Sequence, residues 1–225
     1  MVPARLAELV DMRQRMLAVA TRLFAAHGFD GTTLQDVADA VGVSKPAVIH
    51  HFASKEALRA AALDALLDHW KQTLPRLLLA ATATDDRFDS LIGELLRFFS
   101  SEPDRARLVL RELLDRPYEM GRLMGGAVRP WLAAIAAYVE RGQERGRHHA
   151  DADPEAYVLH VLSFAIAAIA SRDVLAGALD QGPRGESPEA RYERELVRMT
   201  RASLFTPAER TRAARPARRK TRRRR

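Results

Sequence analysis

Residues 28–58 hold two short helical patterns separated by a glycine, and this arrangement constrains the fold more than any other part of the sequence. Thr33 is placed to cap the first helix, whose apolar residues recur at helical spacing and give it one buried face. Gly42 ends that helix, because glycine adopts the left-handed conformation after a helix without steric cost. Ser44 begins a second helix, with Pro46 in its first turn, where a missing N–H costs nothing. The segment is therefore predicted to form two helices around a tight turn.

The second of these helices, over residues 44–52, is only two turns long. An isolated helix of that length is marginal in water, so packing through Val43, Val48 and Phe52 must hold it in place. We expect five residues to face outward: Lys45, Ala47, Ile49, His50 and His51. A short helix held rigidly, with small and polar residues at its exposed end, suits the major groove of DNA. An ordinary helical hairpin within a bundle is the alternative interpretation.

Several sequence runs in residues 13–70 resemble the TetR family of transcriptional regulators. The matching runs are Ala20, Leu23 and Phe24 in the first helix, then GFDGTT at 28–33, DVA at 36–38, GVSK at 42–45 and FASKEAL at 52–58. The chain departs from the usual family pattern at Pro46 and Ala47, which replace a common small-polar pair, and at Ile49 and His51, where an aromatic residue is usual. The resemblance implies a helix-turn-helix DNA-binding domain, which we place at residues 10–70.

The outward positions and the resemblance together predict which residues contact DNA. Cationic side chains and imidazoles suit phosphates, whereas small and apolar side chains suit base edges or thymine methyl groups. The residues expected beside phosphates are Lys45, His50, His51 and Lys55, and those expected at base edges are Ala47 and Ile49. Thr33 and Ser44 complete the predicted DNA-binding set.

The rest of the chain also reads as helical, without strand-like alternation or internal repeats, so an all-α fold is predicted. We expect helices at 3–27, 55–73, 76–82, 86–101, 103–115, 118–146, 154–178 and 188–205. Pro75 is expected to mark the exit from one of them, and Pro130 to break or kink the stretch 118–146.

The resemblance implies that residues 75–205 form a regulatory and dimerisation domain, in which the last two helices pair with their copies in a homodimer. Large and small residues alternate along a stripe from Leu159 to Ala170, which suits close helix approach. We expect a charge placed at Ile166 to weaken that interface. The same stripe is also compatible with the core of a single subunit.

A cavity for an unidentified small-molecule effector is predicted among the aromatic and methionine side chains of the same region. The candidates are Phe98, Phe99, Tyr118, Met120, Met124, Trp131, Tyr138, His160 and Phe164. Such side chains suit an adaptable apolar cavity, and at this spacing they equally suit plain core. The function predicted for the chain is therefore a dimeric, ligand-responsive regulator, more often a repressor, that binds a pseudo-palindromic double-stranded DNA operator.

The positive charge is concentrated at one end of the chain. Residues 206–225 carry a net charge of +9, which leaves −2 for the rest of a chain whose total is +7. A tail of this composition is expected to be disordered and to bind phosphates without sequence preference. A general nucleic-acid-binding protein dominated by the arginine-rich tail is therefore the alternative function.

The sequence gives little support for catalysis, metal binding or membrane association. No cysteine is present, and no cofactor, metal site or enzymatic activity is predicted. The HHADAD run at 148–153 is expected to be a solvated loop rather than a metal site. No signal sequence or long apolar run is seen, so we expect a cytoplasmic protein without membrane contact. A small-molecule binder or enzyme with a vestigial helix-turn-helix is a third possibility, disfavoured by the intact Ser44-Lys45 and Ser54-Lys55 pairs.

Overall fold

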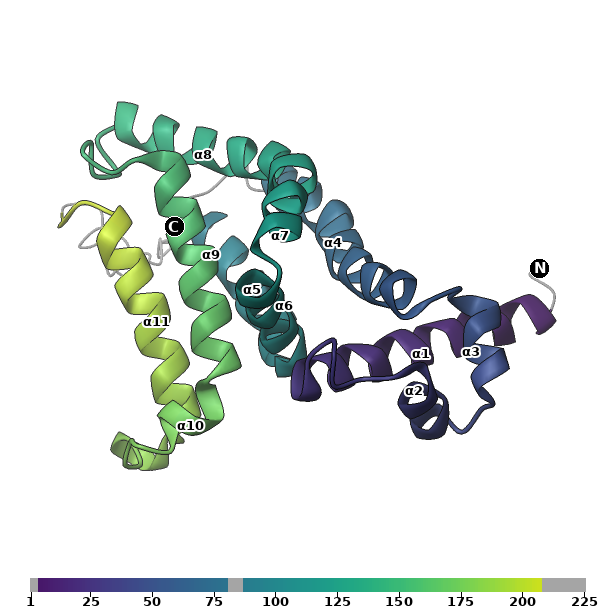
Figure 1. Cartoon of the computed structure of the whole chain (residues 1–225). Helices are drawn as coiled ribbons and strands as arrows, with labels where there is room; N and C mark the ends of the chain where they lie inside the picture. The colour runs from purple at the N-terminus through teal and green to yellow at the C-terminus, as the bar shows by residue number, and fades with distance from the viewer. Residues whose placement is uncertain (1–3, 81–86, 208–225) are drawn as a thin grey trace, which may run out of the picture.

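The computed structural model describes residues 4–80 and 87–207, and every regular element in these ranges is a helix (Figure 1). The elements are α1 (Ala4–His27), α2 (Leu34–Val41), α3 (Lys45–His51), α4 (Lys55–Ala80), α5 (Arg87–Ser100), α6 (Pro103–Asp115), α7 (Pro117–Leu123), the π-helical turn η1 (Met124–Val128), α8 (Arg129–Glu144), α9 (Pro154–Ala170), α10 (Arg172–Ala176), the 3-10 turn η2 (Pro183–Gly185) and α11 (Pro188–Leu204). Extended pairing in the described ranges is limited to one isolated bridge between His148 and Phe205. The all-α prediction is confirmed.

The N-terminal helices enclose a core of their own. Phe24 of α1, Val37 of α2 and Val48 of α3 are all almost completely buried in one hydrophobic cluster. Leu108 of α6 joins the same cluster, so α6 packs against the N-terminal domain and not only against its own neighbours. Figure 1 shows α1–α3 at one end of the molecule, with α6 reaching the end of α1.

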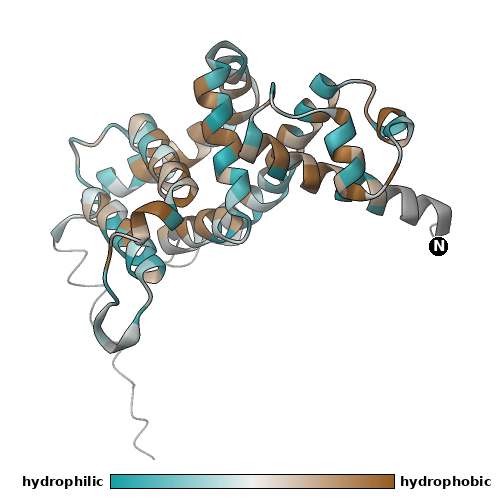
Figure 2. Ribbon diagram, turned by 60° about the horizontal axis from the view of Figure 1, so that its bottom comes forward, coloured by the Kyte–Doolittle hydropathy of each residue, from teal (hydrophilic) through white to brown (hydrophobic). Residues whose placement is uncertain are grey.

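A second hydrophobic cluster fills the space between α5, α6, α8, α9 and α11, with Phe99, Val139 and Ile169 at its centre. Hydrophobic and hydrophilic residues alternate around the turns of these helices (Figure 2), as expected for helices that bury one face. α9 packs on α6 and α8, and α11 lies beside α9 (Figure 1). Residues 208–225, the greater part of the predicted disordered tail, lie outside the described residues.

The structure corrects the predicted break at Pro75. One helix, α4, runs from Lys55 to Ala80 with Pro75 inside it. Proline removes one helical hydrogen bond and normally ends or kinks a helix, but tertiary packing overrides this preference. The preceding Leu74 is 3% exposed and lines an internal cavity, so the helix is anchored in the core immediately before the proline.

The predicted helix over 118–146 is continuous from Pro117 to Glu144, but its regular α-helical winding is interrupted before Pro130. Residues 124–128 form the wide π-helical turn η1, which contains Gly125 and Gly126, and Pro130 lies in the first turn of α8. Similarly, the predicted helix over 154–178 ends at Ala170, where the Ser171 hydroxyl donates to the Ala167 carbonyl at 2.7 Å and α10 follows.

Residues 148–153 lie in a loop, as predicted, but the prediction that His148 is solvated was wrong. Its side chain is 1% exposed, its Nδ1 lies 2.9 Å from the Val139 carbonyl oxygen, and its ring packs edge-on against Phe205. The ring occupies the space above Gly142, where a Cβ would lie 1.9 Å from His148 Nδ1. Because Gly142 has no side chain, the imidazole of His148 can pack directly against α8, at the connection between α8 and α9.

Candidate DNA-binding surface and internal cavity

The first helix of the predicted pair begins with reciprocal capping at Thr33. The Thr33 hydroxyl accepts a hydrogen bond from the Asp36 amide at 3.1 Å, and the Asp36 carboxylate accepts one from the Thr33 amide at 2.7 Å. The bonds from the Thr33 backbone and side chain lower the pKa of Asp36. At the other end, Gly42 has a φ of 80°, in the left-handed region, as its C-cap role predicts. The geometry of the turn between α2 and α3 is thus fixed by local chemistry.

α3 is held by its inner face and exposes its outer face. Val48 and Phe52 are buried at 0% and 3% exposure, whereas Lys45 and His50 are exposed, and Ala47 and His51 are half-buried. Ile49 is 44% exposed, so its apolar side chain is accessible on the outer face of α3. Ser44 occupies the N-cap position, but its side chain makes no capping hydrogen bond.

Lys55 has a partner that the sequence did not indicate. Its ammonium donates a hydrogen bond to the Phe29 carbonyl at 2.9 Å and lies 4.1 Å from the centroid of the Phe29 ring. The charge is thus directed toward the loop before α2, by a hydrogen bond and a cation–π contact. A missed cation contacts the residue that ends α3: the guanidinium of Arg13, on the exposed side of α1, lies 5.1 Å from the centroid of the Phe52 ring.

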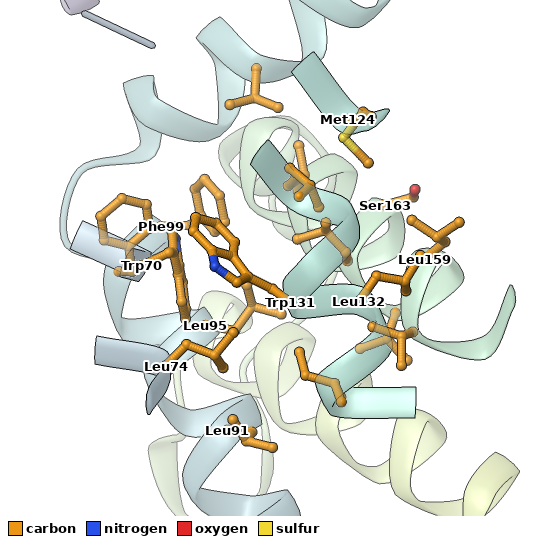
Figure 3. A pocket seen from close by; sticks show the side chains of 18 of the residues that line it. Trp70, Leu74, Leu91, Leu95, Phe99, Met124, Trp131, Leu132, Leu159 and Ser163 are labelled. Atoms are coloured by element: carbon orange, nitrogen blue, oxygen red, sulfur yellow. The ribbon is translucent and has the colours of Figure 1, made fainter. Parts of the chain in front are cut away.

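An apolar cavity of about 250 Å³ lies within the second core, between α4, α5, α6, α7, α8 and α9 (Figure 3). Of the side chains predicted to form a ligand pocket, those that line it are Phe98, Phe99, Met120, Met124, Trp131 and Tyr138. Tyr118 does not, since it is 79% exposed on the outer side of α7. His160 and Phe164 lie on the outer side of α9, with Phe164 42% exposed. Helical spacing alone did not distinguish the two faces of α9.

The cavity wall is connected to the N-terminal domain by a cluster of charged residues that sequence reasoning missed. Arg59 of α4 donates to Glu112 of α6 at 2.5 Å and to Glu119 of α7, with side-chain exposures of 11%, 5% and 47% respectively. The hydrogen bond from Arg59 lowers the pKa of Glu119. Two further contacts link this region to the N-terminal domain: Arg111 of α6 donates to the Ala25 carbonyl of α1 at 2.7 Å, and the guanidinium of Arg116, between α6 and α7, lies 4.2 Å from the ring of Phe29, in the loop after α1.

The outer faces of α9 and α11 present apolar side chains to solvent. On α9 the exposed positions follow helical spacing, at His160, Ser163, Phe164 and Ala167. Met199, 46% exposed on α11, lines the same shallow groove as Phe164. Ile166 is only 4% exposed and lines the internal cavity, so the choice of Ile166 as an interface residue is not supported.

Comparison with known proteins adds to this geometry. Residues 16–62 match the family described as bacterial regulatory proteins, tetR family. Over 180 residues, 80% of each chain, the sequence is 27% identical to the HTH-type transcriptional regulator EthR of Mycolicibacterium smegmatis. It is 33% identical over 137 residues to RutR of Escherichia coli, which covers 58% of this chain and 63% of that regulator.

The fold is similar to that of solved regulators along most of the chain. The structure of the ketosteroid transcriptional regulator KstR2 of Mycobacterium tuberculosis superimposes with a TM-score of 0.64 at 18% identity, covering 92% of this chain and 97% of that one. No helix in the described ranges is both long and apolar enough to span a membrane. Taken together with the α2–turn–α3 geometry, these matches show that the N-terminal DNA-binding domain of this chain, over residues 16–62, belongs to the TetR family of transcriptional regulators.

Proposed function

We propose that the protein is a homodimeric repressor that binds a pseudo-palindromic DNA operator through α3 and releases it when a small molecule enters the internal cavity. The observation that carries the proposal is the pairing of two features in one chain. A short helix exposes Ile49 and Lys45 from a buried base, and an apolar cavity is joined to that domain through Arg59. Two α3 helices related by a two-fold axis match the two half-sites of a symmetric operator.

Within this proposal, α3 divides the work of recognition between phosphates and bases. Lys45, His50 and His51 contact phosphates, and Ala47 and Ile49 meet base edges or thymine methyl groups. Thr33 and Ser44 lie at the N-caps of α2 and α3, where they position the two helices on the sugar–phosphate backbone of the DNA. Lys55 contributes less directly than its sequence suggests, because its ammonium is already engaged by Phe29.

Two substitutions on α3 test this division. Ile49→Ala is expected to change the preferred operator, whereas Lys45→Ala is expected to weaken binding to all sequences and to lower the slope of log affinity against log salt by about one. Binding-site selection followed by titration at several salt concentrations measures both. Leu114→Ala is a matched control, since Leu114 is 72% exposed on α6, away from α3. An unchanged consensus for Ile49→Ala would remove Ile49 from the set of base contacts.

The proposed response to an effector runs from the cavity wall to α4. Met120 of α7 lines the cavity and is adjacent in sequence to Glu119, which binds Arg59. A molecule that shifts α7 therefore changes the partners of Arg59 on the helix that follows α3. The effector acts only to the extent that it binds the released state more tightly than the DNA-bound state.

The arginine-rich tail supports the second candidate function, general binding of nucleic acid, because it carries a net charge of +9 while the rest of the chain carries −2. A chain ending at Pro207 separates the two functions. This end point preserves Phe205, which is 2% exposed, and the Thr206 amide, which donates to the Arg147 carbonyl at 2.9 Å. We expect the shortened chain to bind random DNA more weakly, with a flatter salt dependence, since each phosphate contact contributes about −0.9 to the log–log slope.

Operator preference is expected to survive the truncation, because base contacts come from α3. The measurement is the ratio of affinities for selected and random DNA in the full and shortened chains. If the shortened chain loses operator preference as completely as it loses random-DNA binding, the tail takes part in sequence recognition. The general nucleic-acid-binding function is then favoured.

A further inference from the structure

The wall of the internal cavity has no charged side chain in the described part of the chain. Its lining consists of Leu, Val, Ile, Phe, Met, Trp and Tyr residues and a single serine, Ser163. A carboxylate, phosphate or ammonium in such a place loses its hydration and gains no counter-ion. The cavity therefore selects an uncharged molecule, or the uncharged part of a larger one.

The polar groups of the wall differ in what they offer to a ligand. The Tyr157 hydroxyl donates to the Thr200 carbonyl at 2.8 Å, so its hydrogen atom is already used, and burial raises the pKa of this phenol. Ser163 lies at the edge, where α9 also faces solvent. The Trp131 indole projects into the middle of the cavity (Figure 3), and no acceptor for its N–H is found among the described residues.

An indole N–H donates a hydrogen bond and cannot accept one. A ligand group opposite Trp131 must therefore be an acceptor, such as the carbonyl oxygen of a ketone, ester or lactone. A neutral acceptor satisfies the N–H without bringing a charge into the apolar wall. The two constraints, an absence of charge and a donor at the centre, restrict the ligand chemistry more than either does alone.

The volume limits the size of the enclosed part. A dry apolar cavity of ~150 Å³ holds a benzene ring of six carbon atoms. By proportion, the cavity of about 250 Å³ accommodates roughly ten non-hydrogen atoms at similar packing. That is the size of a medium-length alkyl chain with one carbonyl group.

We infer that the effector is an uncharged, hydrocarbon-rich molecule whose enclosed part carries a hydrogen-bond acceptor held by the Trp131 N–H. This inference rests on the proposed function, because it identifies the class of molecule that the cavity would take as its effector. It assigns a hydrogen bond to Trp131 and apolar contacts to the Leu, Val, Ile, Phe and Met side chains of the wall.

The chain contains two tryptophans, Trp70 and Trp131, and both line the cavity, so intrinsic fluorescence reports on its contents. The first probes are 2-nonanone and nonanoate at pH 7.4, which have similar size and differ in charge. We expect the dissociation constant of 2-nonanone to be at least about 30-fold lower, because the wall offers the carboxylate no counter-ion. Equal or tighter binding of nonanoate would overturn the inference.

A second comparison tests the contact to Trp131. In 2-methyl-1-nonene a methylene group replaces the carbonyl oxygen of 2-nonanone, so the ratio of the two dissociation constants isolates the acceptor. We expect Trp131→Phe to shift this ratio against the ketone by about 2- to 12-fold, as a double-mutant cycle for one hydrogen bond gives. Trp70→Phe removes a similar volume from the wall and is the matched control, and each variant keeps one reporting tryptophan.

A ratio unchanged by Trp131→Phe, or changed equally by Trp70→Phe, would contradict the assignment of Trp131. DNA binding distinguishes this failure from failure of the proposed function. If 2-nonanone shows the expected pattern and does not alter affinity for the selected DNA fragment, the ligand class stands and the ligand-responsive function is wrong. If nonanoate binds more tightly and releases the fragment, the ligand class is wrong and the function stands.

Discussion

Arg59→Met is expected to lower the free energy of unfolding by about 3–5 kcal/mol, because it leaves a buried carboxylate without its cation. Glu112 is 5% exposed on its side chain and lies 2.5 Å from Arg59, in the contact between α4 and α6. Water does not reach the carboxylate to replace the guanidinium. Urea denaturation at a fixed protein concentration measures the effect, since subunit association changes apparent stability.

Two further variants separate the buried pair from the exposed one. Glu119→Gln removes the other partner of Arg59, but Glu119 is 47% exposed, so we expect a loss below about 1 kcal/mol. The double variant Arg59→Met, Glu112→Leu removes both charges and is expected to recover most of the stability lost in the single variant. If Arg59→Met unfolds at the same urea concentration as the wild type, the pair does not hold α4 to α6.

The parts of the fold that sequence reasoning predicted correctly depend on chemistry within a few residues. The capping box at Thr33 and the left-handed Gly42 involve neighbours at most four positions away. The buried base of α3 follows from helical spacing of Val48 and Phe52. Signals of this kind can be recognised in the sequence without knowledge of the tertiary structure.

The parts that sequence reasoning missed depend on contacts between distant segments. Arg59 and Glu112 are 53 positions apart, and Lys55 reaches Phe29 across 26 positions. No spacing rule connects such residues. The burial of His148 similarly depends on Gly142, whose missing side chain provides the space for the ring. In the sequence alone, the run HHADAD has the polar composition of a loop, which gives no sign that its first histidine is buried.

The helix α9 shows where periodicity stops being informative. Its sequence is apolar around most of its circumference, so the pattern does not state which side meets the cavity and which meets solvent. The structure places Ile166 inside and Phe164 outside. On this helix the cavity candidates His160 and Phe164 therefore face solvent, whereas Ile166, which was predicted at the interface, lines the cavity.

Phe164→Glu is expected to convert the proposed dimer into folded monomers, because it would bury two unpaired carboxylates in a symmetric interface between copies of α9 and α11. Phe164 and Met199 are exposed side chains on one shallow groove, and the smaller Ser163 and Ala167 beside them allow another helix to approach closely. The penalty is roughly 3 kcal/mol or more, which is about a 100-fold or greater loss of association. Light scattering at micromolar concentration measures it.

Two further substitutions are controls that separate loss of the dimer interface from an effect of charge alone and from unfolding. Leu114→Glu places the same charge on an exposed leucine of α6 and is expected to leave the dimer intact. Ile166→Glu places it in the core of one subunit, where Ile166 is 4% exposed, and is expected to unfold the protein, which circular dichroism detects. A Phe164→Glu protein that remains fully dimeric would move the interface elsewhere. A folded monomer that also loses affinity for a two-half-site operator, while both half-sites are intact, would show that DNA recognition requires the pairing of two α3 helices.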